Sequence, residues 1–204
     1  MRRVREEKTA VPARIAALAI LVATTVAFAP AHGQPASEAG PYAGRDPVLA
    51  RAVDGFVVPA FARFRADARR LSRAVVRHCL RPSEIAARRV AEAFAETAHA
   101  FGRVSVLRFG PAVETLEFDR LGTPVTSASF VRAEVDALVA GSGIVAEPRD
   151  IAELTASAFA FQGLPALERV LGLDAADGPP PALAPRRCRL ARLIAANVAL
   201  VADD

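Results

Sequence analysis

The sequence predicts an all-α fold, a bundle of about five helices without a sheet. Apolar residues recur at three- and four-residue steps in several long segments, which is the spacing of one helical face. No segment shows the sustained alternation of apolar and polar residues that is typical of a half-buried strand. Helix-capping residues stand at the starts of the periodic segments, and prolines and glycines lie between one segment and the next.

Residues 1–33 have the pattern of a secretory signal peptide. Basic residues precede an uncharged apolar run from Ile15 to Phe28, and small residues follow it. We expect cleavage after Ala31 or Gly33. The run is too short to be a membrane span, and no cysteine lies near the cleavage point to carry a lipid anchor. The sequence therefore predicts a periplasmic or secreted protein without a transmembrane span in its mature chain.

The rest of the chain divides into a linker and a helical domain. Residues 34–45 are rich in Pro, Gly, Ser and Ala and predict a flexible linker, and residues 46–204 carry the helical pattern. The whole chain has a net charge of +4, but residues 1–33 contribute +3 of it, so the exported part is nearly neutral. Because aromatic residues are few and arginines are scattered, nucleic-acid binding is not expected.

The first predicted helix begins at Asp46 and Pro47, a capping residue followed by a proline in the first turn. Pro59 should bend this helix, and the Arg81–Pro82 dipeptide should end it. Its arginines lie mostly on other faces and indicate a solvated surface. The apolar face of this helix carries Leu49, Val53, Phe56, Ala60, Phe64, Ala68, Leu71 and Val75.

The second predicted helix starts after Ser83, which can cap it. Glu96 and His99 have the Glu-x-x-His spacing of di-iron bundles, but those bundles need two such motifs and two more glutamates. A surface or half-buried histidine is therefore the favoured interpretation of His99. His78 is likewise interpreted as a helix-terminal residue with a hydrogen-bond partner, not as a ligand.

Residues 108–128 break the helical pattern with several Gly and Pro turn signals. Long irregular connections inside a compact domain are often functional. This one can fold over the helix that follows and bring Glu114, Glu117, Asp119 or Arg120 near Glu168. Alternatively, it is a covering loop held down by its apolar side chains, and the sequence does not separate the two interpretations.

Two further helices have clear boundaries. Ser127 or Ser129 caps the third helix, which runs through Val139 and ends at Gly141. The last helix is amphipathic and runs from Pro185 to about residue 201.

The fourth predicted helix opens at Asp150 and contains the stretch 158–171, where a Gly and a Pro interrupt an apolar face. Pro165 removes an amide donor and crowds the carbonyl four residues back, so we expect a kink near Phe161. Carbonyls freed by a kink need partners, and Glu168 lies close by in the sequence. The hypothesis is a ligand site at the kink, and the alternative is a packing adjustment with Glu168 in water.

Cys79 and Cys188 are the only cysteines, and both lie in the part expected to be exported. An oxidising compartment favours a disulfide between them, and the alternative is two buried free thiols. Two distant cysteines do not form a zinc site without histidines at the right spacing.

The segment from Gln162 to Glu168 resembles the Gly-x-His-x-x-Glu signature of the imelysin family of bacterial cell-envelope proteins. Gly163 and Glu168 match the signature, and Pro165 occupies the position of its histidine. In the family this signature lies between two helical-bundle halves.

Other short segments of the chain also resemble segments of the family, and they occur in the same order along the sequence. They include Leu107–Pro111, which is similar to an Arg-Phe-Gly-Pro segment, and a cysteine-bearing helix from Arg187 and Cys188 onward. The resemblance covers about residues 46–204, the first half of the usual family length, and the family's Trp-Pro-Asp segment is missing. An absent half would expose an apolar face, which predicts a homodimer or an envelope protein partner.

The resemblance implies an imelysin-like envelope protein that binds a divalent metal, iron or another periplasmic small ligand, in connection with iron acquisition. Glu168 would be the acidic contact, with Gly163 and Pro165 shaping the backbone. Because one carboxylate binds a hard cation weakly, helpers would come from Glu114, Glu117 and Asp119.

Two alternatives stay open. The family's namesake is described as an insulin-cleaving metallopeptidase, but zinc chemistry needs about three protein ligands and a general base. Here the signature histidine is Pro165 and no His-Glu-x-x-His motif occurs, so catalysis is the weaker hypothesis. The other alternative is a truncated helical interaction module without a ligand.

Overall fold

The structure is a computed structural model that describes residues 46–109, 115–122, 127–143, 146–174 and 180–204. All regular structure in these residues is helical, which confirms the predicted all-α class, and none of them forms a strand. The predicted signal peptide and linker lie outside the described residues. None of the described helices combines the length and the apolar character needed to cross a bilayer.

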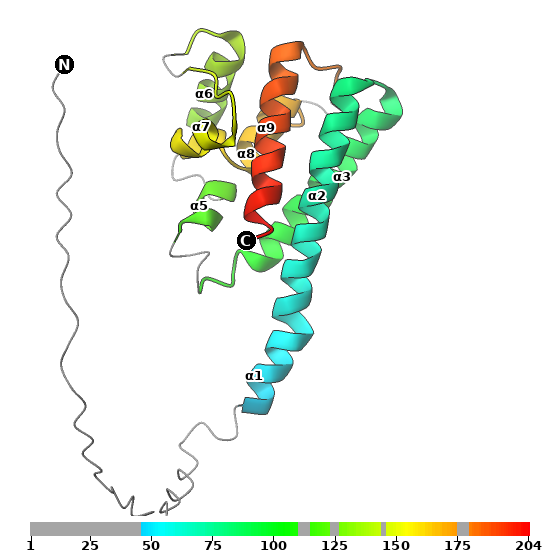
Figure 1. Cartoon of the computed structure of the whole chain (residues 1–204), viewed down its shortest axis with the longest axis vertical. Helices are drawn as coiled ribbons and strands as arrows, with labels where there is room; N and C mark the ends of the chain where they lie inside the picture. The colour runs from blue at the N-terminus through cyan, green and yellow to red at the C-terminus, as the bar shows by residue number, and fades with distance from the viewer. Residues whose placement is uncertain (1–45, 110–114, 123–126, 144–145, 175–179) are drawn as a thin grey trace, which may run out of the picture. The chain divides into compact units, whose positions relative to one another are not determined.

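The first predicted helix consists of three consecutive segments (Figure 1): α1 (Asp46–Ala52), the π-helical turn η1 (Val53–Val57) and α2 (Val58–Leu80). Pro59 lies in the first turn of α2, directly after the π turn. A proline cannot donate the usual bond to the residue four positions back, and the wider π turn absorbs this gap. The disturbance expected at Pro59 is therefore a change of helical register within a continuing helix.

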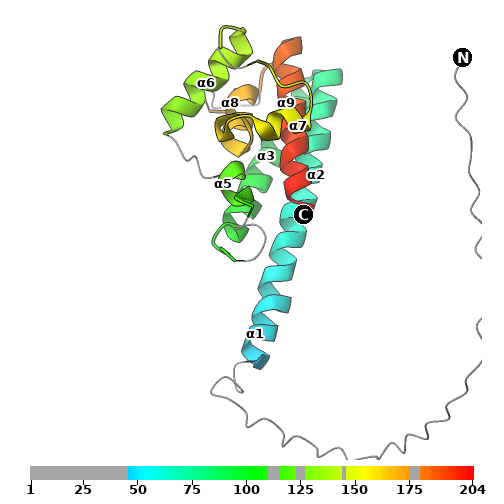
Figure 2. The same ribbon diagram turned by 60° about the vertical axis from the view of Figure 1, so that its left-hand side comes forward.

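The second helix, α3 (Glu84–Val104), returns along α2, and α9 (Pro185–Val201) packs on α2 as well (Figure 2). Ser83 caps α3 as predicted, because its Oγ accepts a hydrogen bond from the Ala86 amide at 3.1 Å. The predicted disulfide is present: Cys79 at the end of α2 is bonded to Cys188 in the first turn of α9, with their Cα atoms 5.6 Å apart.

Four short helices and a 3₁₀ turn fill the space beside these long helices: α5 (Glu117–Leu121), α6 (Ala128–Ala140), α7 (Ile151–Ala156), η2 (Phe159–Phe161) and α8 (Leu164–Leu171). Ser127 caps α6 by accepting from the Phe130 amide, and Gly141 ends it with φ +74°. Both boundaries agree with the sequence analysis. Asp150 caps the next helix, also as predicted, but that helix ends at Ala156.

The core lies where these elements meet, and its largest fully buried apolar side chains come from nearly every helix. They are Phe64, Leu71, Leu121, Leu138, Leu154, Phe161, Leu167, Leu171, Leu190 and Ile194. Phenylalanine rings from α2, α3 and α5 pack together, with centroid distances from 5.6 to 6.3 Å.

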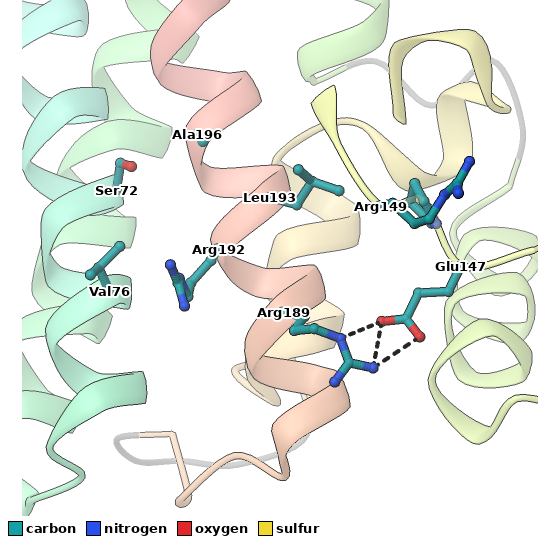
Figure 3. Close-up of a pocket in the computed structure, with 9 residues that line it drawn as sticks. Ser72, Val76, Glu147, Arg149, Arg189, Arg192, Leu193 and Ala196 are labelled. Carbon is teal, nitrogen blue, oxygen red and sulfur yellow. Dashed lines mark hydrogen bonds and ion pairs between the residues drawn. The ribbon is translucent and has the colours of Figure 1, made fainter. Parts of the chain in front are cut away.

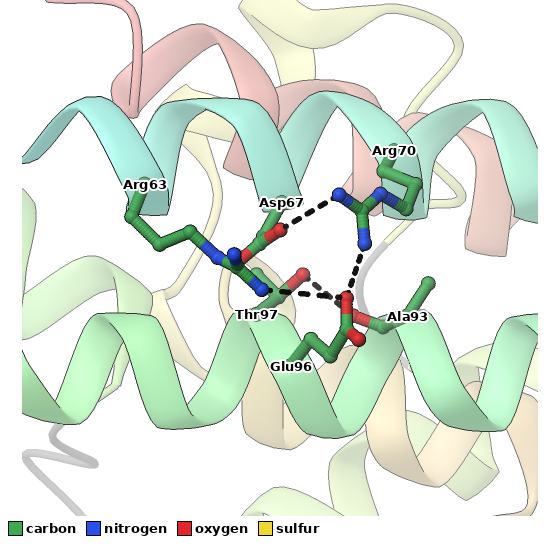
Figure 4. Close-up of polar contacts among 6 residues, drawn as sticks. All are labelled: Arg63, Asp67, Arg70, Ala93, Glu96 and Thr97. Atoms are coloured by element: carbon green, nitrogen blue, oxygen red, sulfur yellow. Dashed lines mark hydrogen bonds and ion pairs between the residues drawn. The ribbon is translucent and has the colours of Figure 1, made fainter.

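A charged cluster joins α2 to α3 (Figure 4). Asp67 is only 1% exposed, although it lies on the apolar face of α2. Arg63 Nε donates to its Oδ2 at 2.6 Å, and Arg70 Nη2 lies 3.4 Å from its Oδ1. The same two arginines reach Glu96 on α3. The cluster therefore compensates a buried carboxylate with arginines whose ends remain in water.

Candidate functional site

The signature lies at the beginning of a helix, not inside a kinked one. Gly163 is extended (φ −117°, ψ −165°) and precedes α8, and Pro165 stands in the first turn of α8. Amide groups in a first turn have no partner within the helix, so a proline there costs no hydrogen bond. The predicted kink near Phe161 is therefore wrong. The chain forms a 3₁₀ turn and a new helix instead.

Three carbonyl groups around this junction have partners, and one of them is Gln162 O, which accepts from Asn197. Phe159 O accepts from the Gln162 amide at 3.1 Å, and Gly163 O accepts from the Leu167 amide at 3.0 Å. Glu168 therefore follows the start of a new helix and not a kink within one.

Gly163 is the point where α5 meets the signature. A Cβ atom placed on it would lie 2.6 Å from the carbonyl carbon of Leu121, and closer still to the carbonyl oxygens of Arg120 and Leu121. Real Cβ atoms do not approach backbone this closely. The signature glycine is thus required by close backbone approach, because the end of α5 rests directly on it.

Glu168 is half-buried on α8, and its carboxylate makes no hydrogen bond or ion pair with any residue that the structure describes. Burial raises the pKa of the Glu168 carboxyl above its ordinary value, and the nearby charge of Asp174 raises it further. Its neighbour Arg169 is engaged elsewhere: its Nε and Nη2 donate to Asp136 at 2.9 and 2.7 Å, and its Nη1 donates to Asp174 at 3.1 Å.

The expected helper carboxylates occupy other positions. Asp119 accepts from Arg108 at 3.2 Å, and Glu117 lines a cavity that does not include Glu168. Glu114 lies outside the described residues. Across the described ranges, no three His, Cys, Asp or Glu side chains are grouped so that they could hold a metal ion.

The two described histidines fit the interpretations made from the sequence. His99 is exposed, and its motif partner Glu96 belongs to the arginine cluster of α2 and α3. His78 is 1% exposed, and its Nε2 lies 3.0 Å from the carbonyl oxygen of Pro181.

A buried pair of amide side chains next to the signature was not predicted. Gln162 is fully buried, and Asn197 on α9 donates from Nδ2 to the main-chain oxygen of Gln162 at 3.1 Å. Asn197 interrupts the apolar face of its helix beside Ile194 and Val198. A polar residue at a core position is the feature of the sequence from which a buried amide could have been predicted.

A groove of about 640 Å³ lies between α2, α9 and the segment 147–149 (Figure 3). Its floor is apolar, with Val76 and Leu193, and Arg189 on its rim pairs with Glu147 at 3.2 Å. Arg192 projects into the same groove and has no ion-pair partner among the described residues. The groove therefore has a positive rim, which Glu147 neutralises only in part.

Residues 57–204 match the protein-family model described as Imelysin. No curated protein and no solved structure matches the chain.

Proposed function

The chain belongs to the imelysin family, and on this premise we propose that it is an exported envelope protein that binds a cationic ligand without carrying out chemistry on it. The match begins within the π turn before α2 and continues to the last residue, so it includes the signature and every helix from α2 onward. The family supports the envelope role, and the geometry around Glu168 supports cation binding.

The observation that carries this proposal is the half-buried, unpaired carboxylate of Glu168. A carboxylate that is partly removed from water costs free energy unless a partner compensates it. Asp174 adds like-charge repulsion to this cost. A bound cation would offset both effects. Gly163 and Pro165 contribute indirectly, because they fix where α8 begins and hence where Glu168 stands.

The ligand can be a divalent metal or iron ion, as the resemblance implies, since hard cations prefer oxygen ligands. The described residues do not fit a tightly held resident metal. The acidic neighbour of Glu168 is Asp174, and Asp174 already forms an ion pair with Arg169. We therefore propose weak binding of the ion as cargo. Glu114 would be a further ligand in this proposal.

The binding proposal is tested by thermal unfolding in the presence of iron, copper, calcium or zinc ions. We expect at least one ion to raise the unfolding temperature of the wild type, and the Glu168→Ala variant to lose this effect. Glu134→Ala is the matched control, because Glu134 is also half-buried and unpaired among the described residues but lies on α6. Unchanged unfolding temperatures of the wild type with every ion would overturn the proposal in its metal form.

Export is tested separately by mass spectrometry of the protein recovered from the periplasm. We expect a mature chain that begins at His32 or Gln34. A full-length chain retained in the cytoplasm would contradict the proposed localisation.

A peptidase is the second candidate, and the family match favours it because the family is named for one. The described residues do not fit a catalytic zinc site, since Pro165 stands where the signature has histidine and both described histidines lie apart from Glu168. The test is hydrolysis of insulin or casein. Turnover that disappears in Glu168→Ala would support the peptidase and contradict the binding proposal, whereas turnover that survives would indicate a contaminating protease.

A further inference from the structure

A second cavity, of about 280 Å³, lies between α5, the end of α9 and the residue that precedes Gly163. Glu168 does not line it, so a ligand in this cavity would bind independently of a cation at Glu168. The cavity wall is largely polar. Its lining includes Glu117, Arg120, Gln162, Asn197 and Asp204, together with two apolar residues of α9, Leu200 and Val201.

Two residues of this wall, Gln162 and Asn197, each carry a buried amide oxygen that lacks a partner. Gln162 is fully buried, and its Nε2 donates to the carbonyl oxygens of Thr155 at 3.2 Å and Ser157 at 2.6 Å. Asn197 is 1% exposed and uses its Nδ2 on the main chain of Gln162. These bonds fix the orientation of both amides and leave Gln162 Oε1 and Asn197 Oδ1 without a donor. Leaving such acceptors unpaired is costly, so a ligand that donates hydrogen bonds to them would gain stability.

The cavity is also lined by one positive side chain, Arg120, and by two negative ones, Glu117 and Asp204. Arg120 is half-buried, its Nε is buried without a partner, and its guanidinium carbon lies 5.1 Å from the centroid of the Phe159 ring. Glu117 is half-buried one turn earlier on α5. Neither Arg120 nor Glu117 forms an ion pair with a residue in the described ranges, although both face the same small space.

We propose that this cavity binds a small zwitterion, an α-amino acid, with its ammonium group at the two amide oxygens and Glu117 and its carboxylate at Arg120. An ammonium group has three donors and matches three acceptors. A carboxylate suits an arginine that has no other ion-pair partner. A simple anion would leave the amide oxygens unpaired and would lie close to Glu117 and Asp204, whereas a metal ion would leave Arg120 without a partner. Leu200 and Val201 leave room for a short apolar side chain.

The experiment is calorimetric titration of the full mature chain with glycine, L-alanine and L-valine at neutral pH, alongside ethylamine and propionate. We expect at least one amino acid to bind, and ethylamine and propionate, which each carry one of the two charges, to bind at least about tenfold more weakly. If no amino acid gives a heat of binding, the proposal is overturned and the cavity holds water only.

Single substitutions locate the binding. Glu117→Gln and Arg120→Gln should each weaken amino-acid binding by about tenfold or more, because each removes one charged contact. Arg192→Gln, in the separate groove of Figure 3, and Glu168→Ala are matched controls that should leave it unchanged. Glu117 is half-buried and unpaired, so its variant should fold even if Arg120→Gln does not. Equal affinity in wild type and Glu117→Gln would place the ligand elsewhere and overturn the assignment.

Discussion

Replacing Gly163 with alanine should destabilise the protein because the new methyl group has no space. It would lie 2.6 Å from the carbonyl carbon of Leu121 and closer to two carbonyl oxygens at the end of α5. These are backbone atoms, so no rotamer change can relieve the contact, and α5 must move as a unit. Overpacking a well-packed site costs about 1–3 kcal/mol. With three backbone contacts under 3.0 Å, we expect a loss near the upper end of this range.

The assay is urea unfolding followed by circular dichroism, with the disulfide intact. Gly102→Ala is the matched control, because a Cβ there would meet nothing within 4 Å and the position is inside α3. Alanine favours a helix by up to about 1 kcal/mol over glycine, so the control should gain stability. A Gly163→Ala variant as stable as the wild type would refute the reasoning that α5 rests on the signature glycine.

Three further outcomes are expected from the polar residues and the disulfide. Glu168→Gln should be more stable than wild type at pH 7 in chelator by less than about 1 kcal/mol, because the raised pKa of Glu168 means that ionisation costs stability as pH rises. This gain should vanish below about pH 4, which pH-dependent unfolding would reveal. Removing Cys79 and Cys188 together should cost at most about 5 kcal/mol in denaturant unfolding, given their separation of 109 residues. Asp67→Asn should cost no more than about 1 kcal/mol. Replacing both of its arginine partners with glutamine should cost more than this, because that change leaves a buried carboxylate uncompensated. Equal losses in these two variants would contradict this account of the cluster.

Several helix boundaries were predictable because each depends on local chemistry. Ser83, Ser127 and Asp150 each accept a hydrogen bond from an amide in the following first turn. Gly141 ends its helix in the left-handed region that glycine favours. Such interactions involve residues only a few positions apart, so the sequence displays them directly.

The signature was misjudged because a proline between apolar residues has two interpretations. It can kink a helix or stand in the first turn of a new one, and Pro165 does the latter. Serine and glycine often interrupt a helix, so Ser157 and Gly163 were the signs in the sequence of a break before Pro165. Both residues are extended in the structure. The tight contact of Gly163 with α5 could not be predicted, since it joins segments about 40 residues apart.

Buried polar residues were the other feature that the sequence did not place. Asp67 and Asn197 lie within apolar helical faces, so periodicity alone assigns them to the core without naming their partners. The partner of Asn197 is a main-chain oxygen of Gln162, 35 positions earlier. Only the packing of α9 against the signature brings the two residues together.

The most direct test of the proposed function is the metal content of protein purified from the periplasm, measured by inductively coupled plasma mass spectrometry beside the Glu168→Ala variant. Cation binding at the signature predicts a sub-stoichiometric metal that accompanies the wild type and Glu134→Ala and is absent from Glu168→Ala. An identical metal content in all three proteins would contradict the assignment of Glu168 as the cation contact.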